Sequence, residues 1–179
     1  MRQAPLTALV SLAAALAMAG CSEQESGLGK PHEEQAAAQT TTEGQPEKAA
    51  AYRSAASRPA PKITVPSGPP PTKLEVKDLQ EGTGPKVKAG DQLAVNYTGV
   101  AYSTGKQFDS SFTRGEPIRF QLGTGMVIPG WDQGLVGARV GARRQLIIPA
   151  RLAYGAQGSP PDIKPNEALV FVLDVLSRR

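Results

Sequence analysis

The segment Val127–Trp131 holds the side chains best suited to chemistry in this sequence. It contains the only tryptophan of the chain, preceded by two β-branched residues, Val127 and Ile128, and by the turn-forming pair Pro129-Gly130. A tryptophan that follows a turn can form the floor of an apolar pocket, because the turn places its ring at the edge of the core. The predicted chemistry is therefore the binding of an apolar group rather than attack on a covalent bond.

The composition excludes most other kinds of catalytic site. The chain has one cysteine, Cys21, and one histidine, His32, and both precede the part that we expect to fold. A domain without these residues cannot build a Ser-His-Asp or Cys-His site, or a zinc site of Cys and His ligands. The sequence contains neither a GxxxxGK[ST] loop nor a GxGxxG turn after a strand, so it gives no support for nucleotide binding. We expect no metal and no cofactor, and an apolar pocket remains.

The N-terminus predicts export and a lipid anchor. Met1-Arg2 is followed by an apolar stretch, residues 6–19. This stretch is shorter than the roughly 20 apolar residues of a membrane-spanning helix, so residues 1–20 are interpreted as a signal peptide. The stretch ends at Cys21 in a sequence that resembles the lipobox of bacterial lipoproteins, although leucine is more usual than Met18. The alternative is an ordinary signal peptide with a chance cysteine.

A lipidated Cys21 would anchor the mature protein, since each buried lipid methylene contributes about 0.8 kcal/mol. The expected location is the bacterial cell envelope, with the protein on the periplasmic side of the outer membrane. After the cysteine, residues 21–71 are predicted to be a disordered, Pro-rich tether. They are rich in small and polar residues, and such a segment cannot bury enough surface to offset the entropy lost on ordering.

Residues 72–179 are long enough for one hydrophobic core and show mainly strand patterns. Strands are predicted around residues 72–79, 93–98, 146–148 and 169–176, of which the last alternates most clearly. A helix is predicted at about residues 130–136, and it is too short to be stable unless it packs on the sheet. The expected fold class is α+β, with an antiparallel sheet wrapped around a single short helix.

The charge of the chain does not indicate a nucleic-acid partner. The net charge is +4, and the arginine pairs at 143–144 and 178–179 are short. Since no basic stripe alternates with exposed aromatic residues, a solvated basic surface is the favoured interpretation.

Five motifs in register resemble the FKBP class of peptidyl-prolyl cis-trans isomerases. The resemblance covers about residues 72–179 and extends to the order and spacing of the motifs. They are Asn96-Tyr97-Thr98-Gly99, Phe108-Asp109-Ser110-Ser111, Val127-Ile128-Pro129-Gly130-Trp131, Ala153-Tyr154-Gly155 and Leu169-Val170-Phe171. The resemblance implies an antiparallel half-barrel sheet curled around one short helix, which agrees with the strand patterns.

The resemblance also implies a shallow apolar pocket for the proline of a polypeptide, with Trp131 as its floor. The implied walls and side are Tyr97, Phe108, Val127, Ile128, Phe171 and Ile163. The backbone N–H of Ile128 and the hydroxyl of Tyr154 would donate hydrogen bonds to substrate carbonyls. Asp109 would lie at the rim, oriented by the hydroxyl of Tyr97. The alternative for Tyr97 and Phe171, which lie on predicted strands, is a position in the core, and the alternative for Asp109, which precedes two serines, is a turn or helix cap.

Such a site needs no nucleophile. Rotation about a peptide bond faces a barrier of about 18 to 20 kcal/mol because of amide resonance. The twisted transition state has lost that resonance and is less charge-separated, so an apolar pocket stabilises it relative to the planar ground state. We therefore expect an isomerase that assists the folding of exported proteins. The alternative is a non-catalytic chaperone or adaptor that uses the same pocket to bind proline-containing segments.

Four positions depart from the common family pattern: Ile118, Leu152, Ser159 and Asp162. Ile118 stands where many members have a second aromatic wall, which implies a pocket that is more open on that side. These changes bear on the residue preferred next to proline and on the macrolide inhibitors tacrolimus and rapamycin, the other partners that the resemblance implies. Some envelope members dimerise through a long N-terminal helix, which a Pro-rich tether does not favour, so we expect a monomer.

Overall fold

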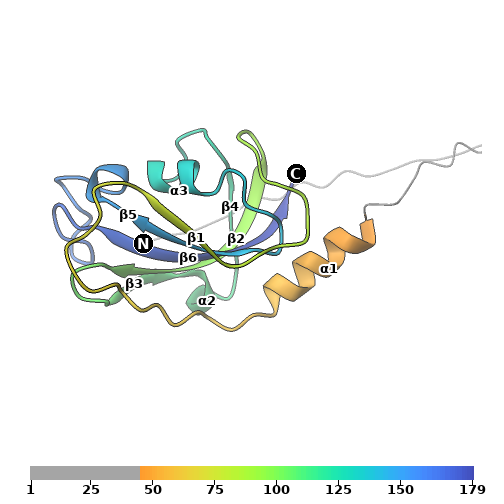
Figure 1. Cartoon of the computed structure of the whole chain (residues 1–179), viewed down its shortest axis with the longest axis horizontal. Coiled ribbons are helices and arrows are strands. Elements are labelled where there is room, and N and C mark those ends of the chain that lie inside the picture. Colours follow the sequence, from red (N-terminus) through yellow and green to blue (C-terminus); the bar gives the residue numbers. More distant parts are fainter. Residues whose placement is uncertain (1–44) are drawn as a thin grey trace, which may run out of the picture. The chain divides into compact units, whose positions relative to one another are not determined.

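The structure, a computed structural model, describes residues 45–179 (Figure 1). Its strands form one antiparallel sheet in the order β1-β5-β6-β2-β3, and β4 pairs with the first half of β2. The strands are β1 (Glu75–Gln80), β2 (Gln92–Ala101), β3 (Gln107–Ser110), β4 (Ile118–Gln121), β5 (Arg143–Ile148) and β6 (Leu169–Arg178). The described helices are α1 (Gln45–Ala56), α2 (Ser111–Arg114), α3 (Pro129–Gly134) and a 3-10 turn, η1 (Ala150–Leu152). The predicted α+β class, an antiparallel sheet with a short helix, is confirmed.

The inner face of the sheet packs against α3. Phe171 and Leu173 of β6 point into this core, as their alternation predicts, and are 3% and 0% exposed. The helix lies directly on β5, because a Cβ atom at Gly134 would come within 2.7 Å of the Leu146 side chain. Glycine at this position therefore lets α3 approach β5 closely, and this approach places Trp131 in the core.

The predicted strands are present with small differences in their ends. Residues 93–98, 146–148 and 169–176 lie within β2, β5 and β6, and residues 72–79 overlap β1. The predicted helix is α3, which ends at Gly134 rather than residue 136. The elements β3, β4 and α2 were not predicted, since each has only 4 residues and carries too little periodic pattern.

The outer face of the sheet is also buried, which the alternation in β6 did not predict. The N-terminal segment, residues 45–71, runs along the side of the sheet opposite to α3 (Figure 1). Two small clusters form beneath it, one of Ile63 and Val65 with Val100, Tyr102, Ile147, Ala168 and Val170, and one of Ala55 with Ala94 and Leu176. These contacts explain why β6 is buried on both faces from Leu169 to Leu176.

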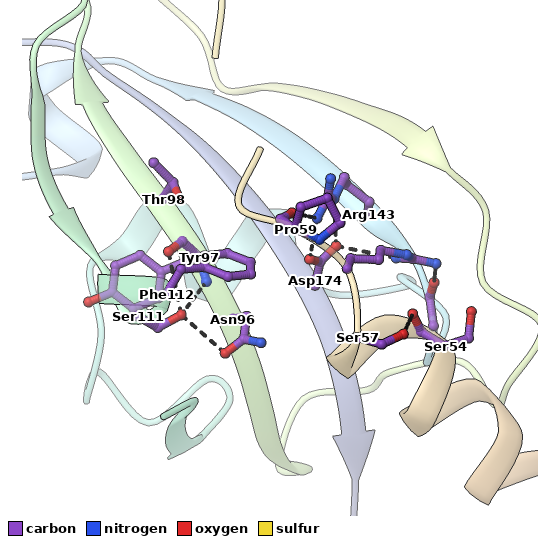
Figure 2. A network of polar contacts seen from close by, with 12 residues as sticks. Ser54, Ser57, Pro59, Asn96, Tyr97, Thr98, Ser111, Phe112, Arg143 and Asp174 are labelled. Atoms are coloured by element: carbon purple, nitrogen blue, oxygen red, sulfur yellow. Dashed lines mark hydrogen bonds and ion pairs between the residues drawn. The ribbon is translucent and has the colours of Figure 1, made fainter. Parts of the chain in front are cut away.

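An ionic cluster fastens the N-terminal segment to the sheet (Figure 2). Asp174 of β6 is 1% exposed and accepts hydrogen bonds from Nε and Nη2 of Arg143 at 2.8 and 2.7 Å. Nη1 of Arg58 lies 3.2 Å from the same carboxylate, and its Nη2 donates to the carbonyl of Gly141 at 2.7 Å. Arg143 in turn donates to the carbonyl of Pro59 at 2.9 Å. The segment is thus bound through both side chains and main chain.

The prediction of a disordered tether is therefore wrong for residues 45–71. The prediction used the average composition of the segment, which does not show two local features. Pro61, Ile63 and Val65 alternate as half-buried residues, and Ala51 and Ala55 form a buried face of small side chains. Residues 1–44, which include the predicted signal peptide and lipidated cysteine, lie outside the described residues.

Candidate active site

A pocket of about 450 Å³ lies between α3 and the inner face of the sheet. It gathers every sequence-predicted site residue of the domain except Ile163, and adds Ile118 and Met126. Its lining is Tyr97, Phe108, Asp109, Ile118, Met126, Val127, Ile128, Trp131, Tyr154 and Phe171. These residues come from β2, β3, β4, α3, β6 and the loops before α3 and after η1. Folding is therefore required to assemble the site, since no single element contains it.

Trp131 forms the floor of the pocket and is 4% exposed. Its ring meets Tyr97 and Phe171 edge-on, with ring centroids 5.0 and 5.2 Å apart and interplanar angles of 76° and 85°. Phe108 stands against Phe171 in the same way, at 5.5 Å and 88°. Edge-to-face contacts of this kind favour one arrangement of the rings, so the apolar walls are held in place by one another.

Asp109 at the rim is held by two donors. The hydroxyl of Tyr97 donates to its Oδ2, as predicted, and Arg114 forms an ion pair with its Oδ1. Nη2 of Arg114 also donates to the Tyr97 hydroxyl oxygen at 2.7 Å, and its guanidinium lies 5.4 Å from the centre of the Tyr97 ring. Each of the three residues Asp109, Tyr97 and Arg114 thus contacts the other two, and these contacts orient the carboxylate.

Sequence reasoning missed Arg114 because it lies at the end of α2, which was not predicted. Ser110 caps this helix by accepting a hydrogen bond from the N–H of Phe112 at 3.3 Å. Ser111 accepts from the N–H of Tyr97 at 2.8 Å and so ties the helix to β2, as Figure 2 shows. The pair of serines after Asp109 is thus a cap and an anchor, and these local signals were available in the sequence.

Burial raises the pKa of Tyr97 above its ordinary value of 10.0, and the hydrogen bond to Asp109 raises it further, while Arg114 opposes this. The folded state therefore holds the phenolic proton more firmly than the unfolded chain does. The stability that this provides is fully present below pH 10 and is lost as the pH rises through the folded-state pKa.

We expect the tyrosinate absorbance of Tyr97 to appear with a midpoint above pH 10. The difference between alkaline titrations of the wild type and the Tyr97→Phe variant isolates this component. The unfolding free energy of the wild type should begin to fall over the same pH range, relative to that of the variant. A midpoint at or below the ordinary value would contradict the prediction.

Two hydrogen-bond donors at the pocket are free to meet a ligand. Within residues 45–179, neither the N–H of Ile128 nor the hydroxyl of Tyr154 donates to a protein acceptor. The Tyr154 hydroxyl stays protonated over a wide range, because burial raises its pKa and the negative charge of Asp109 raises it further. Both groups can therefore donate to a carbonyl placed above Trp131.

The loop before α3 is fixed by Asp132, which sequence reasoning also missed. Its carboxylate accepts hydrogen bonds from the N–H groups of Gly123 and Gly125, at 2.8 and 3.1 Å. The loop then presents Met126 and Val127 at the mouth of the pocket, with Met126 66% exposed. Asp132 in the first turn of α3 thus connects the loop that forms one wall of the pocket to the helix that carries the floor, Trp131.

Ile163 does not line the pocket, contrary to the prediction. Its side chain is 4% exposed and belongs to the main core. Its N–H and carbonyl both pair with Ser159, at 2.9 and 2.8 Å, which closes a small loop around Pro160-Pro161. This pairing turns the isoleucine inward, so the loop covers the core beside the site instead of forming its side.

A second cavity, of about 690 Å³, lies under the N-terminal segment on the outer face. It is lined mainly by small and polar groups, among them Thr64, Ser103 and Asn166. The carboxylate of Glu167 there is already satisfied by the N–H and hydroxyl of Ser103, at 2.8 and 2.9 Å. The aromatic pocket is therefore the better candidate, although it is the smaller of the two.

Comparison with known proteins agrees with this geometry. The sequence profile of the FKBP-type peptidyl-prolyl cis-trans isomerases matches residues 84–176. The FK506-binding protein of Streptomyces anulatus is 52% identical over 118 residues, which cover 65% of this chain and 95% of that protein. Peptidyl-prolyl cis-trans isomerase FKBP15-1 of Arabidopsis thaliana is 53% identical over 88 residues, or 49% of this chain and 57% of that protein.

A solved structure shares the fold. The crystal structure of AtFKBP13 aligns with a TM-score of 0.56 at 35% sequence identity, over 62% of this chain and 96% of that one. The five motifs and the residues that line the aromatic pocket all lie within residues 84–176, the range that the family profile matches. The chain belongs to the family of FKBP-type peptidyl-prolyl cis-trans isomerases and is an enzyme of that type.

Proposed function

We propose that this isomerase assists the folding of exported proteins from the periplasmic side of the bacterial outer membrane, anchored by a lipid on Cys21. The apolar run before Cys21 and the position of this cysteine at its end support the proposal. Within residues 45–179, no helix is both long and apolar enough to cross a bilayer. We further propose that the protein acts as a monomer, for which sedimentation at dimer mass would be the contrary result.

The proposed mechanism rests on the aromatic pocket above Trp131. A proline ring on this floor would be surrounded by Tyr97, Phe108 and Phe171, which removes water from the X-Pro bond. The twisted amide, having lost resonance, is stabilised by this apolar setting more than the planar amide is. Lowering the barrier by about 5 kcal/mol would give an acceleration of a few thousandfold, since each 1.36 kcal/mol is tenfold.

Hydrogen bonds would orient the substrate in this pocket. The free N–H of Ile128 and the hydroxyl of Tyr154 would each donate to a substrate carbonyl, holding the chain on both sides of the rotating bond. Asp109 would lie beside the twisting carbonyl, with its direction set by Tyr97 and Arg114. The proposed substrates are accordingly proline-containing polypeptides, and the open mouth of the pocket leaves room for an extended chain.

We also propose that the same pocket binds the macrolides tacrolimus and rapamycin. The proposal is supported by the relative from Streptomyces anulatus, which is named an FK506-binding protein. The pocket has Ile118 on one wall, and this aliphatic side chain is expected to leave more room than an aromatic ring there. Calorimetric titration of the chain from Ser22 onward with tacrolimus tests the point, and no binding would refute it.

A protease-coupled isomerisation assay on the chain from Ser22 onward tests the proposed mechanism. Peptides that differ only in the residue before proline would show both the acceleration and its preference. Acceleration that macrolide abolishes supports catalysis in this pocket. Binding of the peptides without acceleration would instead favour the proline-binding chaperone.

Replacing Cys21 with serine is expected to release the full-length protein from bacterial membranes, because no lipid can be attached. The measurement is the distribution of wild type and Cys21→Ser between membrane and soluble fractions. Incorporation of labelled palmitate into the variant would overturn the anchor proposal, while isomerase activity would be the same in both.

A further inference from the structure

The position of Trp131 depends on a helix that is too short to satisfy its own terminal backbone groups. The helix α3 has 6 residues, begins with Pro129 after Ile128, and has no side-chain hydrogen bond at its N-cap. A helix of this length leaves most of its terminal N–H and C=O groups without partners inside the helix. Something outside the helix must therefore fix its C-terminal end if Trp131 is to remain at one height in the pocket.

Arg144 supplies partners at that end. It lies on β5, its side chain is on the inner face with Leu146 beneath α3, and the residue is only 7% exposed. Its Nη1 donates to the carbonyl of Gly134 at 2.9 Å and to that of Val136 at 3.3 Å. A cation at the C-terminal end of a helix also interacts favourably with the negative end of the helix dipole.

Asp78 on β1 fixes the direction of this guanidinium. Its Oδ1 accepts from Nε of Arg144 at 2.6 Å and its Oδ2 accepts from Nη2 at 2.8 Å. The two residues are also direct partners in the pairing of β1 with β5. A bidentate pair of this kind fixes the plane of the guanidinium, so Nη1 is left to point at the helix end.

We propose that Arg144, oriented by Asp78, is a positioning residue for isomerisation: it fixes the C-terminal end of α3 and thereby the height of Trp131 in the pocket. The inference rests on the proposed role of Trp131 as the pocket floor. A buried arginine on an otherwise apolar inner face would be costly to desolvate, and its hydrogen bonds to the helix end account for its presence there. The geometry makes β1, an exposed edge strand, part of the support of the active site.

The test compares Arg144→Met with Arg143→Met in the chain from Ser22 onward. Arg143 is the adjacent residue on the same strand and also forms a bidentate pair with a carboxylate, that of Asp174, but on the outer face. Methionine keeps an unbranched stem and removes the donors. Both variants are studied where circular dichroism and urea titration show them to be folded.

Two measurements are made on each variant: kcat/KM for a proline peptide and the emission maximum of Trp131, which is the only tryptophan of the chain. We expect Arg144→Met to lower kcat/KM by roughly tenfold, as displacement of a binding group by less than 1 Å can do, and to shift the emission. Arg143→Met should leave both values as in the wild type. Arg144→Lys should lie between them, because an ammonium group cannot bind Asp78 and both carbonyls in the same geometry.

Wild-type emission and activity in folded Arg144→Met would overturn the proposal, as would equal changes in Arg143→Met. If Arg144→Met does not fold, Asp78→Asn takes its place, since it keeps the arginine and weakens only its orientation. That variant should shift the emission in the same direction, and an unchanged emission would count against the proposal. A shifted emission in a chain whose wild type shows no isomerase activity would separate the positioning role from the enzymatic one.

Discussion

Alanine in place of Trp131 is expected to lower kcat/KM for X-Pro isomerisation by roughly ten- to a hundredfold. Burying an apolar ring against the indole contributes about 1.5 to 3 kcal/mol, and each 1.36 kcal/mol is tenfold in rate. The substitution also opens the pocket into the core, where Tyr97 and Phe171 lose their edge-on partner. The measurement is the protease-coupled assay at a temperature where the variant is folded.

Leu176→Ala is the matched control for this variant. Leu176 is 1% exposed, but it lies on the outer face with Ala55 and Ala94 and touches no part of the pocket. Both substitutions should lower the free energy of unfolding, by about 2 to 5 kcal/mol each. Only Trp131→Ala should lower the activity per folded molecule. An equal loss in the control, or full activity in folded Trp131→Ala, would remove the indole from the mechanism.

Removal of residues 1–71 is expected to destabilise the domain by on the order of 4 kcal/mol. The shorter chain loses the apolar contacts of Ile63 and Val65 with the outer face. It also loses Arg58, so that the carboxylate of Asp174, 1% exposed, is left with Arg143 as its remaining partner. Urea unfolding of chains beginning at Thr72, Gln45 and Ser22 measures the effect.

The chain beginning at Gln45 should unfold at the same urea concentration as the one beginning at Ser22, since both keep the N-terminal segment. A point variant gives the same test with less disruption. Arg58→Met should lower the unfolding free energy, whereas Arg53→Met, an exposed arginine of α1 that forms no ion pair in the described part of the chain, should not. Equal midpoints for the chains beginning at Thr72 and Gln45 would refute the structural role of the segment.

The pocket was predictable because its residues sit on strong patterns. Tyr97 and Phe171 lie on strands with clear alternation, and Trp131 follows an unmistakable turn. The order and spacing of the family motifs then assigned these residues to one pocket, and Ile163 is the predicted residue that does not line it. Its orientation depends on the two hydrogen bonds to Ser159, a loop geometry that no periodic pattern expresses.

The polar supports of the site could not be predicted from periodicity. The roles of these charged residues depend on the fold: Arg114 lies at the end of an unpredicted helix, Asp132 accepts hydrogen bonds from a loop without a periodic pattern, and Arg144 pairs with a residue 66 positions away. In the sequence each resembles an ordinary surface charge. The N-terminal segment was missed for the opposite reason: its apolar residues are few, and they matter only because β6 offers an apolar outer face for them to cover.

The docking of the N-terminal segment also sets how far the catalytic domain can work from its proposed anchor at Cys21. With residues 45–71 bound to the sheet, only residues 22–44 separate the lipid from the domain, and a fully extended chain of that length spans at most about 80 Å. Had the chain been free up to residue 71, the limit would be about 180 Å. The catalytic domain would thus work only within about 80 Å of the membrane surface that holds the proposed anchor.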